Sequence, residues 1–174
     1  MTKYDLPKSK SLVGTCAPAA RTSFFALCEK ENEPERNLTV IDLNCITGFY
    51  PVVDGDTLEK TFSLCMTSNS MDFAFVVDSG ETLLGEIKFN VDRSIYGQLK
   101  NLLAKFKGTY RRMYSMVNGR FYNRSIVLFN STCYEEAKNV LSRLDEAFQE
   151  DLLSLSMKLH FEARTLPAFM NEFF

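Results

Sequence analysis

The clearest local pattern in the chain is a pair of short apolar runs separated by a polar turn. The first run covers residues 73–77 and the second covers residues 83–89, and the sequence DSGE between them supplies a turn glycine. Short runs rich in valine, isoleucine and phenylalanine that flank such a turn are typical of paired strands. The sequence therefore predicts a β-hairpin over these residues.

Two longer segments repeat their apolar residues at helical spacing. In residues 94–117 the apolar positions follow each other mostly in steps of three and four, at Ile95, Leu99, Leu102, Leu103, Phe106, Tyr110, Met113 and Val117. A second stripe of this kind runs through residues 134–159. Because this spacing places the apolar side chains on one side of a helix, we expect two amphipathic helices, the first interrupted near Gly108.

The remaining segments predict a shorter helix, further strands and one turn. Residues 19–32 carry a helical stripe, whereas residues 37–53 are rich in β-branched and aromatic residues and predict one or two strands. Residues 54–60 predict a turn, and residues 124–130 form a short apolar strand. This order of elements predicts a mixed α/β fold with a single central sheet flanked by helices.

Length and composition limit the classes of protein to be considered. A chain of 174 residues with 45% hydrophobic and 24% charged residues suits one globular domain, here 1–174. We expect residues 1–15 to be a flexible arm, residues 19–130 to form the core, and residues 134–174 to form a C-terminal helix and tail. The chain has no run of 18 apolar residues and no secretory signal, so we expect a cytoplasmic protein without membrane contact.

Cysteine and histidine usage narrows the candidate chemistry further. The five cysteines are scattered without a C-x-x-C pair, and there is a single histidine. A zinc knuckle, a redox pair and a histidine-rich metal site are therefore disfavoured, and reduced thiols are expected. Any chemistry in this chain has to depend on carboxylates and lysines.

The small net charge of −2 hides an uneven distribution of charged residues. Residues 93–132 contain no acidic residue and carry eight of the 20 lysines and arginines, so all 22 acidic residues lie elsewhere. A basic segment that also contains several aromatic residues can bind a phosphate backbone and stack bases. A solvated helix face that pairs with acidic neighbours gives the same pattern, and the charge alone favours this second interpretation.

The predicted hairpin carries three charged residues in strands that are otherwise apolar. Asp72 opens the first strand, and Glu86-Ile87-Lys88 lies in the second. Residues two apart on a strand share a face, so Glu86 and Lys88 point to the same side while Ile87 points to the other. If Asp72 lies beside them, two hard carboxylates and an amine meet at one point, and this donor set suits Mg²⁺ or Mn²⁺.

The type of turn decides whether Asp72 can join this group. A two-residue turn at Ser79 and Gly80 would place Asp72 opposite Ile87, and its side chain would then point away from Glu86. A three-residue loop or a bulge shifts the pairing by one residue and reverses that outcome. A shared site therefore requires an irregular hairpin.

At these residues the sequence resembles the PD-(D/E)XK nuclease superfamily, which has a restriction-endonuclease-like fold. Asp72 matches the aspartate of the signature, with Met71 at the proline position, and Glu86-Ile87-Lys88 matches the E-x-K part. The resemblance covers about residues 19–130 and implies a helix, three strands, a helix and a strand, here followed by an added C-terminal helix. It also implies accessory roles for Glu29 on the first helix and Gln98 on the helix after the motif.

The function expected from these residues is metal-dependent phosphodiester hydrolysis by an endonuclease acting on DNA or RNA. Asp72 and Glu86 would hold Mg²⁺ or Mn²⁺ together with the carbonyl of Ile87, and Lys88 would position the attacking water. Five basic residues would hold the nucleic-acid backbone without reading its sequence, namely Lys100, Lys105, Lys107, Arg111 and Arg112.

A second hypothesis makes the chain a non-catalytic interaction protein on the same kind of fold. It would be an inactive nuclease-like subunit, or an inhibitor of the immunity or antitoxin type. The acidic remainder of the chain supports this hypothesis, because an acidic surface suits a basic protein partner. In that case Glu86 and Lys88 would form an ion pair on a sheet face.

Overall fold

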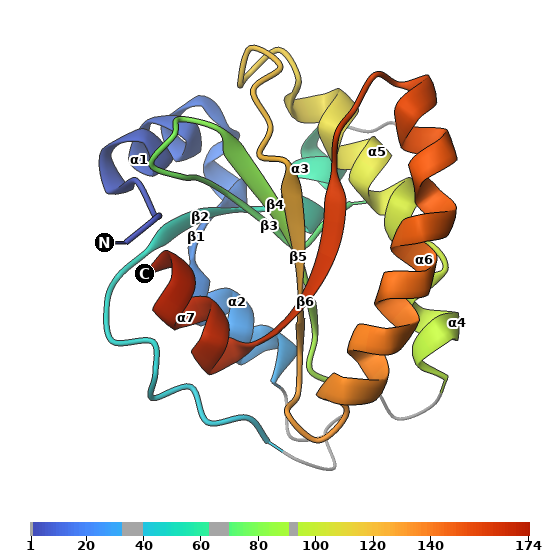
Figure 1. The fold of residues 1–174 in the computed structure, drawn as a ribbon. Helices are drawn as coiled ribbons and strands as arrows, with labels where there is room; N and C mark the ends of the chain where they lie inside the picture. The colour runs from blue at the N-terminus through green and yellow to red at the C-terminus, as the bar shows by residue number, and fades with distance from the viewer. Residues whose placement is uncertain (1, 33–39, 63–69, 91–93) are drawn as a thin grey trace.

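A computed structural model of the chain describes residues 2–32, 40–62, 70–90 and 94–174. Its centre is one six-stranded sheet, in which the strands lie side by side in chain order from β1 to β6. Helices pack on both faces of this sheet (Figure 1). The prediction of a mixed α/β fold with one central sheet and flanking helices is confirmed.

The sheet is antiparallel in its first half and parallel in its second. Its strands are β1 (Arg21–Ser23), β2 (Pro51–Asp54), β3 (Phe73–Val76), β4 (Thr82–Lys88), β5 (Arg124–Phe129) and β6 (His160–Thr165). The pairs from β1 to β4 are antiparallel, whereas β4, β5 and β6 pair parallel to one another. Parallel neighbours require a long crossover connection, which is why helices separate β4, β5 and β6 along the chain.

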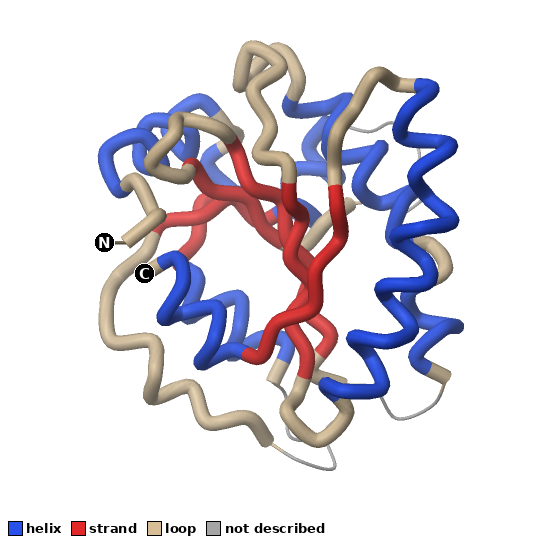
Figure 2. The backbone as a smooth tube through the Cα atoms, viewed as in Figure 1, coloured by secondary structure: helices blue, strands red, loops and turns tan. Residues whose placement is uncertain are grey.

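Helices cover the two faces of the sheet unequally (Figure 2). They are α1 (Leu6–Thr15), α2 (Phe24–Glu31), α3 (Gly55–Phe62), α4 (Ile95–Leu99), α5 (Leu102–Met113), α6 (Tyr134–Ser154) and α7 (Leu166–Phe173), with a 3₁₀ turn at Pro18–Ala20. Side chains of α2 and α7 pack on one face, and those of the other α-helices pack on the opposite face. No helix within the described residues is long and apolar enough to cross a membrane.

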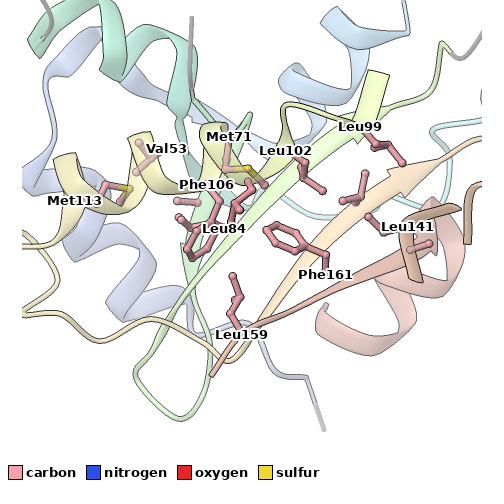
Figure 3. Close-up of a cluster of buried hydrophobic side chains, with 14 of the residues drawn as sticks. Val53, Met71, Leu84, Leu99, Leu102, Phe106, Met113, Leu141, Leu159 and Phe161 are labelled. Atoms are coloured by element: carbon pink, nitrogen blue, oxygen red, sulfur yellow. The ribbon is translucent and has the colours of Figure 1, made fainter. Parts of the chain in front are cut away.

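Two hydrophobic cores fill the space between the sheet and these helices. The crossover core lies on the side of α5 and α6, where Phe106 of α5 and Leu141 of α6 are grouped with Phe161 of β6 (Figure 3). The aromatic core lies on the side of α2 and α7 and is dominated by phenylalanine rings. β4 contributes to both, because Leu84 belongs to the crossover core and Ile87 to the aromatic core. This alternation fixes which way each residue of β4 points.

The strongly periodic elements are found where the sequence predicts them. The hairpin is confirmed in β3 and β4, the short apolar strand in β5, and the long C-terminal helix in α6, which ends at Ser154 and not at residue 159. The helix expected over residues 94–117 is divided into α4 and α5 at Lys100 and Asn101. Gly108 lies inside α5 and does not interrupt it.

Residues 6–15 of the expected flexible arm form the helix α1, so that expectation is wrong for them. The Asp5 carboxylate accepts a hydrogen bond from the Lys8 amide at 2.9 Å and caps α1, which has a proline in its first turn. Leu12 and Val13 of this helix are buried in the crossover core. The cap and this packing stabilise a helix whose sequence is largely polar.

Two further segments differ from their predictions, and a third contains one strand where one or two are predicted. Residues 19–32 are not one helix but contain the end of the 3₁₀ turn, β1 and α2, and residues 54–60 enter α3 rather than a turn. Within residues 37–53 the described part contains only the strand β2, and residues 37–39 lie outside the described residues.

The C-terminal segment is more than the expected helix and tail, because it adds the strand β6 and the helix α7. Phe161 and Ala163 of β6 are buried, whereas Glu162 and Arg164 between and beside them form ion pairs. Four residues of α7 are buried in the aromatic core, namely Leu166, Phe169, Met170 and Phe173. Glu162 and Arg164 pair with each other and also with Arg124 and Glu172, so the charged positions of β6 are neutralised partly by side chains from other elements.

An ion-pair network around Glu172 ties the two chain ends together, which lie near each other in Figure 1. The Glu172 carboxylate accepts hydrogen bonds from Lys3 at 2.7 Å, from Arg124 at 2.7 Å and from Arg164 at 3.1 Å. Partial burial raises the pKa of this carboxyl, but the three cationic donors outweigh burial and lower it from 4.5 to about 2. The network therefore joins the N-terminus, β5 and β6 to α7.

We expect Glu172→Gln to lower the stability of the protein by about 2 kcal/mol at neutral pH, a value reduced for solvent screening. Because the pKa of Glu172 falls on folding, its contribution is complete above the ordinary value of 4.5 and is lost as the pH falls towards about 2. Urea denaturation at several pH values measures this difference. An equal difference between wild type and variant at every pH would contradict the assignment.

Candidate functional site

β4 carries a carboxylate and an amine on its crossover face, at the end where it leaves the sheet. Glu86 is completely buried, and the Lys88 side chain is 20% exposed. Both point to the side of α5, because Leu84, two residues before Glu86, lies in the crossover core. The sequence-based prediction that Glu86 and Lys88 share a face agrees with this arrangement.

The hairpin has the irregular turn that a shared site requires. Phe73 pairs with Gly85 and Val76 pairs with Thr82, which leaves a three-residue loop at positions 78–80 beyond the Val77 to Glu81 backbone hydrogen bond. Gly80 closes this loop with a φ of 83°, a left-handed conformation that favours glycine. Extending the register by one residue sets Asp72 opposite Glu86, on the same face of the sheet.

Asp72 is held in place by the backbone of the neighbouring strand. Its Oδ2 atom accepts a hydrogen bond from the Ile87 amide at 2.6 Å, and its Oδ1 atom lies 4.0 Å from Nζ of Lys105. Burial and the nearby Glu86 charge raise the pKa of Asp72 well above its ordinary value, against the effects of Lys88, Lys105 and the Ile87 amide. Such a carboxyl is costly to ionise unless a further cation approaches it.

The two carboxylate oxygens of Glu86 differ, because one contacts two ammonium groups and the other has no partner among the described residues. Its Oε1 atom lies 2.6 Å from Nζ of Lys88 and 2.5 Å from Nζ of Lys105. Its Oε2 atom is buried and has no hydrogen-bond partner within the described residues. A buried carboxylate oxygen without a partner costs at least about 1–3 kcal/mol, and functional sites are among the places where this cost is tolerated.

Lys105 belongs to this site, although the sequence analysis places it among the nucleic-acid contacts. It comes from α5, on the layer of helices that covers the sheet, and its side chain is 23% exposed. Desolvation lowers its pKa, but the charges of Glu86 and Asp72 outweigh this effect and the net pKa is raised. Asp72, Glu86, Lys88 and Lys105 are called the cluster below.

Two more carboxylates interact electrostatically with the cluster, and the sequence analysis missed both. Glu31 is the last residue of α2. Burial raises the pKa of its carboxyl, the charges of Asp56 and Glu86 raise this pKa further, and the charge of Lys88 lowers it. Asp56 begins α3 and accepts a hydrogen bond from the Ser70 hydroxyl at 2.7 Å. Glu31 follows the buried Leu27 by four residues, so helical spacing would have placed Glu31 on the buried face of α2.

Neither accessory residue expected from the family resemblance forms a hydrogen bond or ion pair with the cluster within the described residues. Glu29 is exposed on α2, on a different side of that helix from Glu31. Gln98 donates a hydrogen bond from its side chain to the Asn90 carbonyl at 3.3 Å. The acidic residue of α2 that interacts with the cluster is therefore Glu31.

The other predicted nucleic-acid contacts fall into two groups. Lys100 and Arg111 are exposed. Lys107 lies 3.8 Å from the Asp151 carboxylate, and Arg112 forms a 3.0 Å ion pair with buried Glu59. The ion pair of Arg112 therefore links α5 to α3. Because Lys107 and Arg112 face carboxylates, the basic segment 93–132 has less unpaired positive surface charge than its sequence indicates.

The donor set of the cluster fits one hard divalent cation. Asp72 Oδ1 and Glu86 Oε2 are carboxylate oxygens on the same face, and the latter lacks any partner in the described part of the chain. Within the same residues, no three histidine, cysteine or acidic side chains are grouped so as to hold an ion. Mg²⁺ and Mn²⁺ suit a two-carboxylate site, because they retain several waters and also bind substrate phosphate.

Comparisons of the chain with protein-family models, with curated proteins and with solved structures gave no match. Function is therefore inferred from the cluster and its surroundings.

Proposed function

We propose that the protein is a divalent-metal-dependent nuclease that hydrolyses phosphodiester bonds of DNA or RNA at this cluster. The observation that carries the proposal is that Asp72 and Glu86 both approach the Lys105 ammonium group, while the buried Oε2 oxygen of Glu86 has no partner among the described residues. A structural ion pair would not require a second buried carboxylate beside the first one. A cation site does require both.

Three residues of the cluster, Asp72, Glu86 and Lys88, have direct tasks in this proposal. Asp72 and Glu86 would hold Mg²⁺ or Mn²⁺, with the Ile87 carbonyl as a further ligand, and the Ile87 amide fixes the Asp72 carboxylate. When bound, the cation polarises the phosphoryl group and lowers the pKa of a coordinated water. Lys88 orients the attacking water, whose oxygen bonds to phosphorus as the ester bond breaks, and the departing oxygen takes up a proton.

The order of elements around the cluster supports the proposal. α2 precedes the strands β2, β3 and β4, with α3 inserted between β2 and β3, and α4, α5 and then β5 follow. Apart from the inserted α3, this is the sequence of helix, three strands, helix and strand that the resemblance to the PD-(D/E)XK superfamily implies. Asp72 stands directly before β3, and Glu86 and Lys88 end β4.

Exposed groups beside α4 and α5 offer a path for a nucleic-acid backbone. Lys100 and Arg111 are free to contact phosphates electrostatically, and Tyr96 and Tyr114 are 58% and 51% exposed. Cationic side chains contribute affinity without sequence preference, and exposed rings can stack on bases. These residues would position the backbone near the cluster.

One observation favours the alternative of a non-catalytic interaction protein. With both carboxylates ionised, Lys88 and Lys105 neutralise Asp72 and Glu86 formally, and both ammonium groups contact the same Glu86 oxygen. A neutral cluster of this kind can stabilise a fold without binding metal. The unpartnered Glu86 oxygen is what this alternative leaves unexplained.

Lys88→Met is expected to lower the rate of Mn²⁺-dependent hydrolysis about a hundredfold or more, while Mn²⁺ still binds, because the lysine positions water and is not a ligand. Cleavage of mixed single- and double-stranded DNA and RNA with Mn²⁺ or EDTA measures the rate. Lys107→Met is the matched control on α5. Absence of both cleavage and Mn²⁺ binding in the wild type would reject the nuclease proposal and favour the interaction protein.

A further inference from the structure

We propose that Lys105 is a resident counter-ion that competes with the divalent cation and thereby couples metal binding to nucleic-acid binding. This inference depends on the proposed function and adds a regulatory feature to the same site. It assigns to Lys105 the role of a positioning residue that exchanges partners during each cycle.

The position of the Lys105 ammonium group carries the inference. Nζ lies 2.5 Å from Oε1 of Glu86 and 4.0 Å from Oδ1 of Asp72, so one positive charge serves both carboxylates. A dication held by the same two residues would need this space. Lys88, in contrast, forms an ion pair only with Glu86 within the described residues, and it belongs to the same strand.

The charge balance shows why metal and Lys105 compete. When Asp72 and Glu86 are both ionised, as metal ligands are, their charges and those of the two ammonium groups sum to zero, so a bound dication leaves two excess positive charges in a partly buried site. Like charges within a few ångströms repel strongly where solvent is limited. Metal binding is therefore weak until Lys105 withdraws or a further anion arrives.

A phosphodiester is the anion that resolves this excess. Its negative charge neutralises part of the metal-loaded site, and its oxygens provide the withdrawn Lys105 with a new partner. The Lys105 side chain is 23% exposed, so its ammonium group has access to solvent and to a bound phosphate. Cation and nucleic acid consequently bind more tightly together than separately, and thermodynamic linkage makes this coupling reciprocal.

The test is a titration of Mn²⁺ by calorimetry, with and without a short phosphorothioate oligonucleotide of mixed sequence that resists hydrolysis. Lys105→Met is expected to bind Mn²⁺ alone about tenfold more tightly than the wild type, since the competing charge is gone. The oligonucleotide should strengthen Mn²⁺ binding markedly in the wild type and much less in this variant. Lys105→Arg, which keeps the charge, should retain the wild-type coupling.

Lys107→Met is the control, because Lys107 lies on the same helix and faces Asp151 instead of the cluster. Circular dichroism establishes that each variant is folded, and Lys105→Gln provides a second neutral variant. If wild type binds Mn²⁺ but neutral variants bind it equally or more weakly with unchanged coupling, the counter-ion role is overturned while the nuclease proposal stands. If no protein binds Mn²⁺ with or without the oligonucleotide, the proposed function is overturned as well.

Discussion

Glu86→Gln is expected to abolish stabilisation by Mn²⁺ and to lower hydrolysis at least about a thousandfold, the equivalent of about 4 kcal/mol of transition-state stabilisation. The variant keeps the shape of the side chain but loses the charge that holds the cation. In the wild type, Mn²⁺ should raise the melting temperature because it binds only the folded protein. Melting curves with and without Mn²⁺, together with the cleavage assay, measure both effects.

Without metal, the same variant should be less stable than the wild type by about 2 kcal/mol. Repulsion between Asp72 and Glu86 alone would predict the opposite sign, but both ammonium groups of the cluster contact Glu86 Oε1. Removing one partner of a buried ion pair leaves uncompensated charge. The loss is moderate because Lys88 and Lys105 are 20% and 23% exposed and can turn towards water.

Glu29→Gln is the control for this experiment, because Glu29 is an exposed carboxylate on α2. It should behave like the wild type in both the melting curves and the cleavage assay. Equal Mn²⁺ responses in wild type and Glu86→Gln would contradict the metal site. A defect in Glu29→Gln would instead restore the accessory role expected from the family resemblance.

The parts of the fold that the sequence predicts well are those governed by local periodicity. The apolar spacing of α5 and α6 and the paired runs of β3 and β4 carry their signal within the element itself. In β6 the alternation is short, and Glu162 and Arg164 pair with each other and with Arg124 and Glu172 from other elements, so the segment alone does not show what stabilises its charged positions. The polar helix α1 is hidden for a related reason, since its stability depends on a cap and on tertiary packing.

The candidate site shows the same division. Strand alternation alone puts Glu86 and Lys88 on one face, but the position of Asp72 depends on one residue in the loop that Gly80 closes. The approach of Lys105 is a tertiary contact between α5 and β4, separated by 19 residues. The sequence shows that Lys105 is charged but not which residue it contacts. Basic residues that look equivalent along the chain therefore have different surroundings in the fold, since some belong to the cluster, some form structural ion pairs and some are exposed.

Gly55→Ala is expected to destabilise the protein by about 2–4 kcal/mol, because a methyl group there would overlap the backbone carbonyl oxygen of Met71. Backbone atoms cannot turn aside as a flexible side chain does. The Gly55 amide also donates to the Asp72 carbonyl at 3.0 Å, so α3 begins in direct contact with the segment that positions Asp72. Urea denaturation measures the loss, and a weaker Mn²⁺ response should accompany it.

Gly14→Ala separates this local overlap from a general effect of replacing glycine. Gly14 lies in α1, where an added methyl group meets no atom within 4 Å, so alanine should stabilise the helix by about 0.5–1 kcal/mol. The two substitutions add the same methyl group and are expected to act in opposite directions. A Gly55→Ala protein as stable as the wild type would show that α3 does not rest on the Met71–Asp72 backbone, and the support for the Asp72 position would be lost with it.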